Sequence, residues 1–146
     1  MKKTFKKSDI IDQDKLNKDI EETFERLKNN PKNFKRRTPE QVYEDTVLGL
    51  VLEYYLIQND PKYKKATDLN STDYYHDLID TETGEIHECK VTRSYMGWES
   101  FYVQNRIKRI ITEGWNHSKY MHLATYNSKT GVYTYQGIKK IRDHGL

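Results

Sequence analysis

The sequence predicts a mixed α/β domain whose central sheet has about four or five strands and is flanked by helices. Three observations lead to this prediction. Two stretches with apolar residues at helical spacing open the chain, and two pairs of short alternating segments follow. A third helical stretch separates the two pairs. Helices and strands are therefore interspersed along the chain, as in a mixed α/β domain. The 146 residues suffice for one domain with one core.

The first two helical stretches differ in how much of their surface is apolar. The first, at about 12–29, ends at Asn29-Asn30-Pro31 and carries a single apolar stripe formed by Leu16, Ile20, Phe24 and Leu27. The second, at about 39–59, begins at Thr38-Pro39-Glu40-Gln41, which combines an N-cap, a proline in the first turn and a capping-box glutamine. It is apolar on most faces, which predicts a buried core helix.

The chain before residue 38 is expected to be an extension of the main domain. Residues 1–8 are basic and predict a mobile arm, and residues 32–37 form a basic linker. The amphipathic helix between them is a candidate for packing on the core or on a second subunit. The domain itself is expected to span residues 38–146.

The first pair of strands is predicted on either side of a turn. Residues 74–80 and 86–94 have strand character, and the segment 81–85 between them contains Gly84. We expect the two strands to pair as an antiparallel hairpin.

A helix and a second pair of strands complete the prediction. The helix, at about 99–112, turns Val103, Ile107, Ile110 and Ile111 inward. Residues 119–126 and 132–136 follow as strands around a polar turn, and the segment from Gly137 onward is short, basic and expected to be helical.

Charge and cysteine content narrow the class of function. The net charge of +3 is mild, but bases cluster at the N-terminus, at 32–37, in an expected loop at 62–65 and on the helix at 106–109. Such clusters either neutralise phosphates or lie on solvated faces balanced by nearby acids. A single cysteine, Cys89, excludes a disulfide framework and a cysteine-based zinc site. The lack of a signal peptide or a bilayer-length apolar run predicts an intracellular, cytoplasmic protein.

A group of residues in the expected hairpin forms a candidate catalytic site. Asp77 lies on the first strand, and Glu88-Cys89-Lys90 lies on the second. Alternate residues of a strand share a face, so Glu88 and Lys90 point one way and Cys89 points to the core. Strand pairing would bring Asp77 beside Glu88, and two adjacent carboxylates with the backbone carbonyl of Cys89 suit Mg²⁺. Phosphodiester hydrolysis needs such a cation and positive charge near the transition state, which Lys90 would supply.

This arrangement resembles the PD-(D/E)xK nuclease superfamily. His76-Asp77, ten residues and then Glu88-Cys89-Lys90 are similar to its signature, although the proline of the signature is His76 here. The resemblance covers roughly residues 38–136 and implies a restriction-endonuclease-like fold, that is, a mixed sheet flanked by helices. Many members place a glutamate on the helix before the first strand. This implies a role for Glu44, whose surroundings, Glu44–Val47, are similar to the helix of small phage resolvases.

The resemblance therefore implies a magnesium-dependent endodeoxyribonuclease, in which Mn²⁺ would substitute for Mg²⁺. The implied catalytic residues are Glu44, Asp77, Glu88 and Lys90, and the implied metal ligands are Glu44, Asp77, Glu88 and Cys89. The candidate DNA-binding residues are Lys35, Arg36, Arg37, Arg93, Gln104, Arg106 and Arg109. A chain this short has little room to read sequence, so we expect structure-selective or weakly sequence-selective cutting of double-stranded or branched DNA. Cutting both strands needs two sites, which predicts a homodimer.

Other functions remain open. A site-specific restriction-like endonuclease, an RNA-directed nuclease and a non-catalytic DNA-binding protein that keeps the fold are all compatible with the sequence. A nuclease of the His-metal type is disfavoured, because His117 and His122 lack partners at metal-ligand spacing.

Several residue assignments also have alternatives. Asp80 is an alternative to Asp77, and Glu53, which interrupts an apolar run, is an alternative to Glu44. The motif as a whole could instead be a cross-strand ion pair on a solvent face. The aromatic residues that flank the motif either stack on bases or pack in the core: Tyr74, Tyr75, Tyr95 and Trp98.

Overall fold

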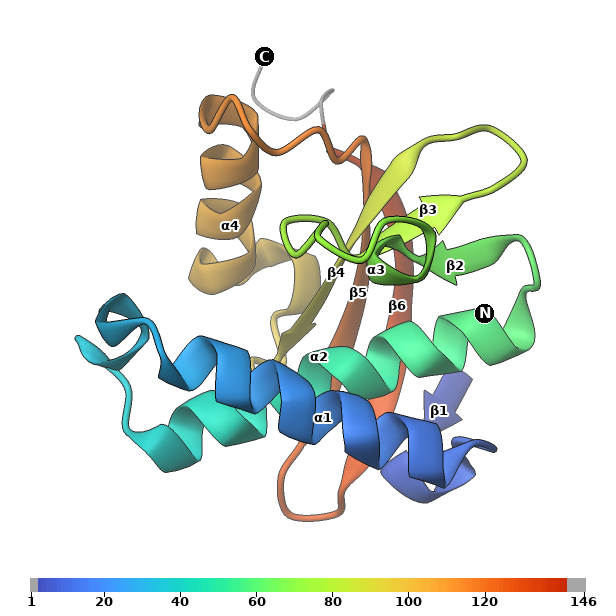
Figure 1. Ribbon diagram of the computed structural model, residues 1–146. Helices are drawn as coiled ribbons and strands as arrows, with labels where there is room; N and C mark the ends of the chain where they lie inside the picture. Colours follow the sequence, from blue (N-terminus) through green and yellow to red (C-terminus); the bar gives the residue numbers. More distant parts are fainter. Residues whose placement is uncertain (1–2, 142–146) are drawn as a thin grey trace.

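The structure is a computed structural model that describes residues 3–141. In chain order its elements are β1 (Lys3–Phe5), η1 (Lys7–Asp9), α1 (Gln13–Lys28), η2 (Pro31–Phe34), α2 (Pro39–Asn59), β2 (Tyr63–Lys65), α3 (Ala66–Leu69), β3 (Leu78–Asp80), β4 (Ile86–Thr92), η3 (Gly97–Glu99), α4 (Phe101–Thr112), β5 (Tyr120–Asn127) and β6 (Val132–Lys140). Helices α1 and α2 cross one face of the sheet, and α4 stands against the other (Figure 1).

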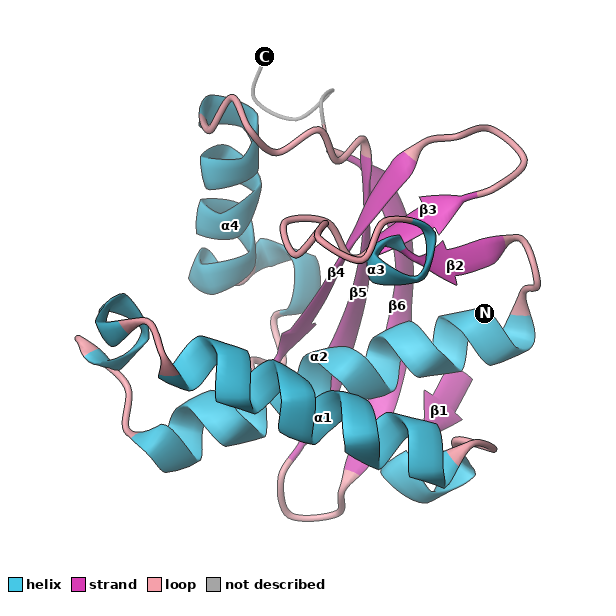
Figure 2. Ribbon diagram, viewed as in Figure 1, coloured by secondary structure: helices cyan, strands magenta, loops and turns pink. Residues whose placement is uncertain are grey.

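The sheet is mixed and has six strands in the order β1-β6-β5-β4-β3-β2 (Figure 2). β4 and β5 run parallel, with α4 in the crossover between them, and the other neighbours are antiparallel. The predicted class is confirmed, but the predicted count of four or five strands is wrong. The added strands, β1 and β2, have three residues each, which is too short to show alternation.

Both N-terminal helices begin where the sequence predicts, because side-chain caps satisfy their free backbone N–H groups. The Asp12 carboxylate accepts the N–H of Lys15 at the start of α1. Thr38 and Gln41 exchange hydrogen bonds of 3.2 and 2.8 Å at the start of α2. As predicted, α2 is a core helix, and Val51 and Leu52 are fully buried. None of the helices within residues 3–141 has the length and apolar character needed to cross a bilayer.

The N-terminal segment is part of the sheet, so the prediction of a mobile arm is wrong for residues 3–8. β1 pairs with β6, and the Phe5 ring lies between Tyr55 and Tyr133, with ring centroids 3.8 and 4.9 Å away. Helix α1 buries Leu16 and Ile20 in the same core. Its apolar stripe is thus used within the chain, and the extension shares one core with the rest of the domain.

The predicted hairpin exists as β3 and β4, joined by a turn in which Gly84 has a positive φ of 76°. β3 starts at Leu78 rather than at residue 74. Asp73 explains the difference, because its carboxylate accepts the N–H of Tyr75 and contacts the ring of His76 at 3.0 Å. Local side-chain bonds of this kind compete with strand formation. The expected loop at 62–65 is also wrong in part, since Lys64 and Lys65 belong to β2.

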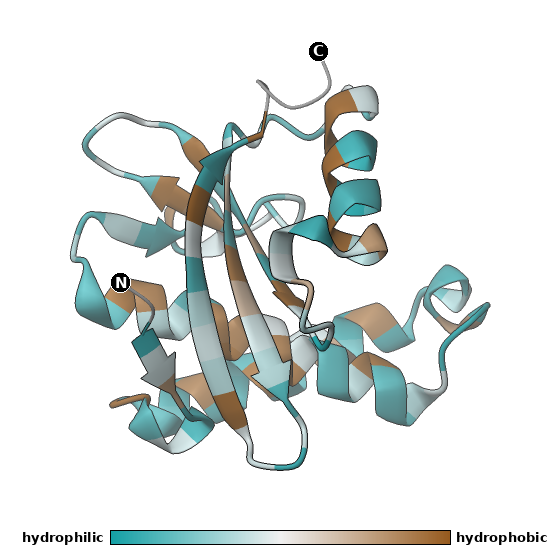
Figure 3. Cartoon of the chain, turned by 180° about the vertical axis from the view of Figure 1, so that it is seen from behind, coloured by the Kyte–Doolittle hydropathy of each residue, from teal (hydrophilic) through white to brown (hydrophobic). Residues whose placement is uncertain are grey.

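The C-terminal half places α4 against the sheet through its apolar face. In Figure 3 that face of α4 lies toward the strands and the hydrophilic face points away. Val103, Ile107 and Ile110 pack with Met121 and Leu123 of β5. The helix expected from Gly137 is wrong for residues 137–140, which continue β6, and residues 142–146 lie outside the described part of the chain.

Candidate functional site

Strand β4 presents the candidate motif on two faces, as the alternation predicts. Glu88 and Lys90 are in register with Met121 and Leu123 of β5, which pack against α4. Cys89 packs on the opposite side, against the core formed with α1 and α2. Glu88 is only 3% exposed, so the alternative of an ion pair on a solvent face is wrong.

Asp77 lies beside this motif, immediately before β3. The pairing of Leu78 with His87 brings it opposite Glu88. One carboxylate oxygen of Asp77, Oδ2, accepts the backbone N–H of Cys89 at 2.9 Å, which orients the side chain toward β4. Burial and then the neighbouring Asp77 carboxylate raise the pKa of Glu88 well above its usual value. A buried acid, Glu88, thus lies beside a partly buried one, Asp77.

Arg106 of α4 lies over the Glu88 carboxylate. Its Nε and Nη2 donate to Glu88 Oε2 at 2.9 and 2.6 Å. This attraction lowers the pKa of Glu88 but does not offset the effects of burial and Asp77. The Arg106 side chain is 27% exposed, against 4% for Glu88. An arginine predicted to bind phosphate therefore contacts an acid of the candidate site.

Lys90 is half-buried on the same face as Glu88 and Arg106. Burial and then the positive charge of Arg106 lower its pKa, against the opposing effects of Asp45 and Glu88. A lysine in this position releases its proton more readily than an exposed lysine does.

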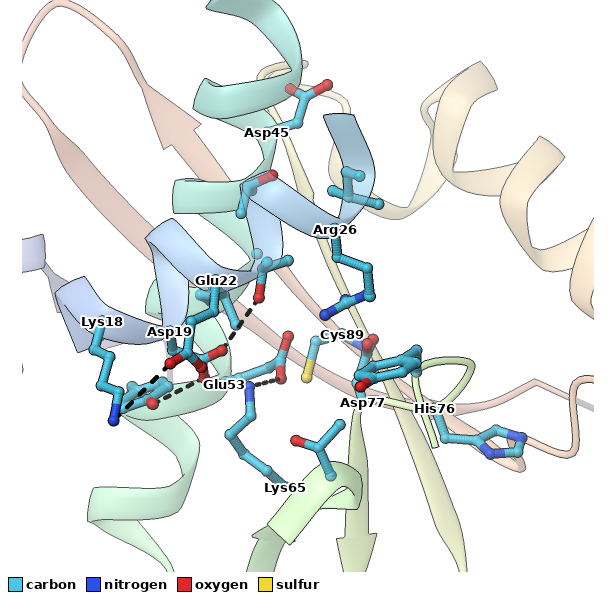
Figure 4. A pocket seen from close by; sticks show the side chains of 18 of the residues that line it. Lys18, Asp19, Glu22, Arg26, Asp45, Glu53, Lys65, His76, Asp77 and Cys89 are labelled. Atoms are coloured by element: carbon cyan, nitrogen blue, oxygen red, sulfur yellow. Dashed lines mark hydrogen bonds and ion pairs between the residues drawn. The ribbon is translucent and has the colours of Figure 1, made fainter. Parts of the chain in front are cut away.

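Glu53 is the glutamate of α2 that the structure brings toward Asp77. It is 8% exposed, and burial raises its pKa to about 8; Lys65 opposes that rise, and Asp77 adds to it. Lys65 Nζ lies 3.4 Å from Glu53 and 2.7 Å from Asp19 of α1. Figure 4 shows Glu53, Cys89 and Asp77 turned toward one another.

Glu44, the predicted metal ligand on α2, is placed elsewhere. It pairs with Arg93 at 3.0 Å and is half exposed. Glu44 and Glu53 are nine residues apart, which in an α-helix means opposite faces and a separation of roughly 13 Å along the axis. The structure therefore turns Glu53, and not Glu44, toward Asp77, and the metal-binding role of Glu44 stays a prediction.

A cavity of about 850 Å³ reaches the candidate site from the side of α1 and α2. Asp77 and Cys89 form part of its wall, together with Glu53 and the segment 65–77. At its edge the guanidinium of Arg26 lies 4.1 Å from the centre of the Tyr74 ring. Tyr74 therefore packs on α1 and is not a free stacking surface.

The other predicted DNA-binding residues are distributed over two regions. Near the start of α2, Asp45 binds both Arg37, at 2.9 Å, and Arg93, at 3.2 Å. Lys35 and Arg36 are exposed nearby in the chain. On α4, Arg109 pairs with Glu113 at 3.4 Å, and Gln104 donates to the backbone carbonyl of Trp98 at 2.6 Å. Of these predicted DNA-binding residues, Arg37 lines the cavity that contains Asp77, and the others are not among the residues that line it.

Two histidines form a buried polar chain that the sequence did not predict. His87 Nδ1 lies 2.9 Å from His122 Nε2, and His122 Nδ1 lies 2.7 Å from the hydroxyl of Tyr135. Burial lowers the pKa of His122 to about 3, so both rings are neutral at physiological pH. His87 faces away from Glu88, as expected, and the chain is a satisfied element of the core. Asp80, the alternative to Asp77, binds its own turn and Lys62.

The donor chemistry at Asp77 and Glu88 fits a magnesium ion, which is commonly held by one or two carboxylates while water and substrate phosphates complete its shell. Burial and the neighbouring Asp77 raise the pKa of Glu88, and a cation bound between the two carboxylates would relieve their repulsion. Within residues 3–141 there is no larger group of acidic, histidine or cysteine side chains arranged to hold a metal. Comparisons with protein families, with curated proteins and with solved structures find no match to this chain.

Proposed function

We propose that this protein is a metal-dependent nuclease that hydrolyses DNA phosphodiester bonds, with Asp77, Glu88 and Lys90 at its active site. The observation that carries the proposal is the bond from the Cys89 N–H to the Asp77 carboxylate, 2.9 Å long. It joins the two halves of the motif across β3 and β4. The mixed sheet flanked by helices is also the architecture that the motif's resemblance implies.

Each side chain has a distinct role in this proposal. Asp77 and Glu88 hold Mg²⁺ or Mn²⁺, with the backbone carbonyl of Cys89 as a further oxygen donor. The bound cation would polarise the scissile phosphate and lower the pKa of the attacking water. Lys90, on the same face as Glu88, holds that water or a phosphate oxygen and stabilises the charge that develops in the transition state.

Residues 3–141 fold around one sheet, and we propose structure-selective or weakly sequence-selective cutting by this unit. Arg37 and Arg93, near the start of α2, would contact phosphates outside the scissile group. A homodimer would place two sites on one DNA, but α1 is no longer its preferred interface because its apolar stripe is buried within the chain.

A second function is favoured by one observation. Arg106 already neutralises Glu88, with bonds of 2.9 and 2.6 Å, so the buried acid pair is partly compensated without a metal. A non-catalytic DNA-binding protein that keeps the fold would need no more than this. It would bind DNA in a salt-sensitive manner and would not turn it over.

Cleavage of supercoiled plasmid tests the two functions. The wild type is compared with Glu88→Gln and Lys90→Met in Mg²⁺, Mn²⁺ or EDTA. The matched controls are Glu85→Gln, at the edge of β4, and Lys64→Met, an exposed lysine of β2. We expect metal-dependent cutting that falls by about 10²–10³-fold in the two site variants, the usual cost of losing one transition-state contact, and that persists in the controls.

The opposite outcomes are equally informative. Cutting that survives both site substitutions would place the active site elsewhere. A wild type that binds plasmid, four-way junctions and RNA without cutting any of them would favour the non-catalytic function.

A further inference from the structure

The guanidinium of Arg106 lies within the candidate site rather than at its rim. Its Nε and Nη2 are 2.9 and 2.6 Å from Glu88 Oε2, and its side chain is only 27% exposed. Arg109, one turn later on α4, pairs instead with Glu113 and is 58% exposed. One helix thus carries two arginines of the same charge, of which one reaches the acid pair.

The acid pair needs more positive charge than Arg106 provides. Asp77 lies opposite Glu88 across the β3–β4 pairing and turns its carboxylate toward β4, whereas both hydrogen bonds of Arg106 go to Glu88. A guanidinium carries one positive charge and can offset one of two adjacent carboxylates, whereas a divalent cation can offset both. The position beside Glu88 therefore favours replacement of the guanidinium by a metal.

Arg106 is also held in a way that permits release. Both of its hydrogen bonds end on a single oxygen of Glu88, whereas the strongest arginine–carboxylate pairs use both oxygens. The second oxygen is not held by Arg106. Helix α4 is anchored to the sheet independently, through Val103, Ile107 and Ile110, so the guanidinium can move toward water while the helix stays in place.

We propose that Arg106 is an internal counter-ion that holds Glu88 in the metal-free protein and is displaced from it when the divalent cation binds. This inference rests on the proposed nuclease function. This role distinguishes Arg106 from the other basic residues near the site. Arg106 binds the metal-binding carboxylate of Glu88, whereas the others are candidates for binding DNA. By linkage, any contact that draws Arg106 away from Glu88 strengthens metal binding to the same degree.

The test is the affinity of the folded, DNA-free protein for Mg²⁺, measured by isothermal titration calorimetry at one fixed pH and ionic strength. We expect Arg106→Gln to bind Mg²⁺ about tenfold more tightly than the wild type, the size of a typical coupling between two sites. Arg109→Gln is the matched control. It removes the same charge from the same helix, and because that charge is exposed and screened, the affinity should change by less than about twofold.

A second measurement uses the wild type alone, so that it stands even if Arg106→Gln does not fold. The Nε–H of Arg106 gives an NMR signal that reports its bond to Glu88 and is assigned through its couplings along the Arg106 side chain. We expect saturating Mg²⁺ to move this signal toward the position of a solvated arginine and to leave the Arg109 signal in place.

Three results would overturn the inference. An Arg106→Gln protein that binds Mg²⁺ no more tightly than the wild type would do so, as would an Arg106 signal that Mg²⁺ leaves unchanged. In both cases plasmid cleavage by the wild type would keep the nuclease function intact. A wild type that neither binds Mg²⁺ nor cuts any nucleic acid would contradict both the proposed nuclease function and this inference.

Discussion

Two bases, one buried and one partly exposed, lie on opposite faces of the sheet, and both contact buried glutamates. Lys65 lies beneath α1 and α2 and contacts Asp19 and Glu53 at 2.7 and 3.4 Å. Arg106 belongs to α4, on the other face, and contacts Glu88 at 2.6 Å. The Lys65 side chain is 9% exposed and that of Arg106 is 27% exposed. The two clusters have similar chemistry but differ in enclosure and in the elements that they join.

That difference separates a structural ion pair from a candidate functional one. Lys65 connects β2 to two helices, and its own pKa is raised because the attraction of Glu53 and Asp19 exceeds the cost of burial. Arg106 connects only α4 to β4, and it leaves a second acid, Asp77, beside the carboxylate that it binds. An enclosed base with two acids supports the fold, whereas a partly exposed base in a site with excess negative charge can be exchanged.

The largest effect expected from this comparison is on stability at Lys65. The substitution Lys65→Met leaves Asp19 and Glu53 without their cation, and removing one partner of a buried pair costs about 3–5 kcal/mol. Urea denaturation measures the loss. Its neighbour Lys64 is exposed on the same strand, so Lys64→Met should change the free energy of unfolding by less than about 0.5 kcal/mol. Equal losses in the two variants would mean that the cluster does not support the fold.

The corresponding change at Arg106 should cost less. Arg106→Gln removes two hydrogen bonds to a charged group, but water reaches the position, so we expect a loss of about 1–2 kcal/mol. The same urea titration gives the value. A loss as large as that of Lys65→Met would contradict the view that Arg106 is exchangeable, and the comparison between the two faces would fail.

Glu53 provides a prediction that depends on pH. Burial raises its pKa to about 8, above the usual value near 4.5, so the folded protein binds this proton more tightly than the unfolded chain does. For an acid with a raised pKa, stability is lost as the pH rises from the unfolded value through the folded one. We expect Glu53→Gln to reduce this loss between pH 4.5 and about 8. Thermal unfolding across that range measures it, and wild-type and variant curves that stay parallel would show that Glu53 does not titrate there.

Much of the fold was predictable from local patterns. The helices near 12–29, 39–59 and 99–112 have clear apolar periodicity, and the first two also carry capping residues. The turn at Gly84 indicated the hairpin. The three-residue strands β1 and β2 have no pattern of their own and exist because β6 and β3 offer them hydrogen bonds. Strand pairing between distant segments is not encoded in the short segment itself.

The candidate site was predictable only in part. Strand alternation was enough to predict that Glu88 and Lys90 share a face and that Cys89 does not. The contact between Arg106 and Glu88 depends on how α4 packs on β4, 18 residues away, and local sequence does not determine it. Glu53 did carry a signal, since it is a charge in an apolar run, whereas Glu44 was preferred for its position in a family pattern. In the structure Glu53 is the glutamate of α2 that lies toward Asp77.

The smallest expected effect is at Glu44, and it tests whether Glu44 or Glu53 belongs to the site. Glu44→Gln removes an exposed ion pair with Arg93, in which the two side chains are 50% and 47% exposed. Such pairs contribute at most about 1 kcal/mol, and Glu44 lies on the face of α2 opposite Glu53. We therefore expect the variant to unfold within about 0.5 kcal/mol of the wild type and to cut plasmid at a rate within about twofold of it. A loss of cleavage as large as that of Glu88→Gln would return Glu44 to the active site, and α2 would then have to lie differently against β4 when DNA is bound.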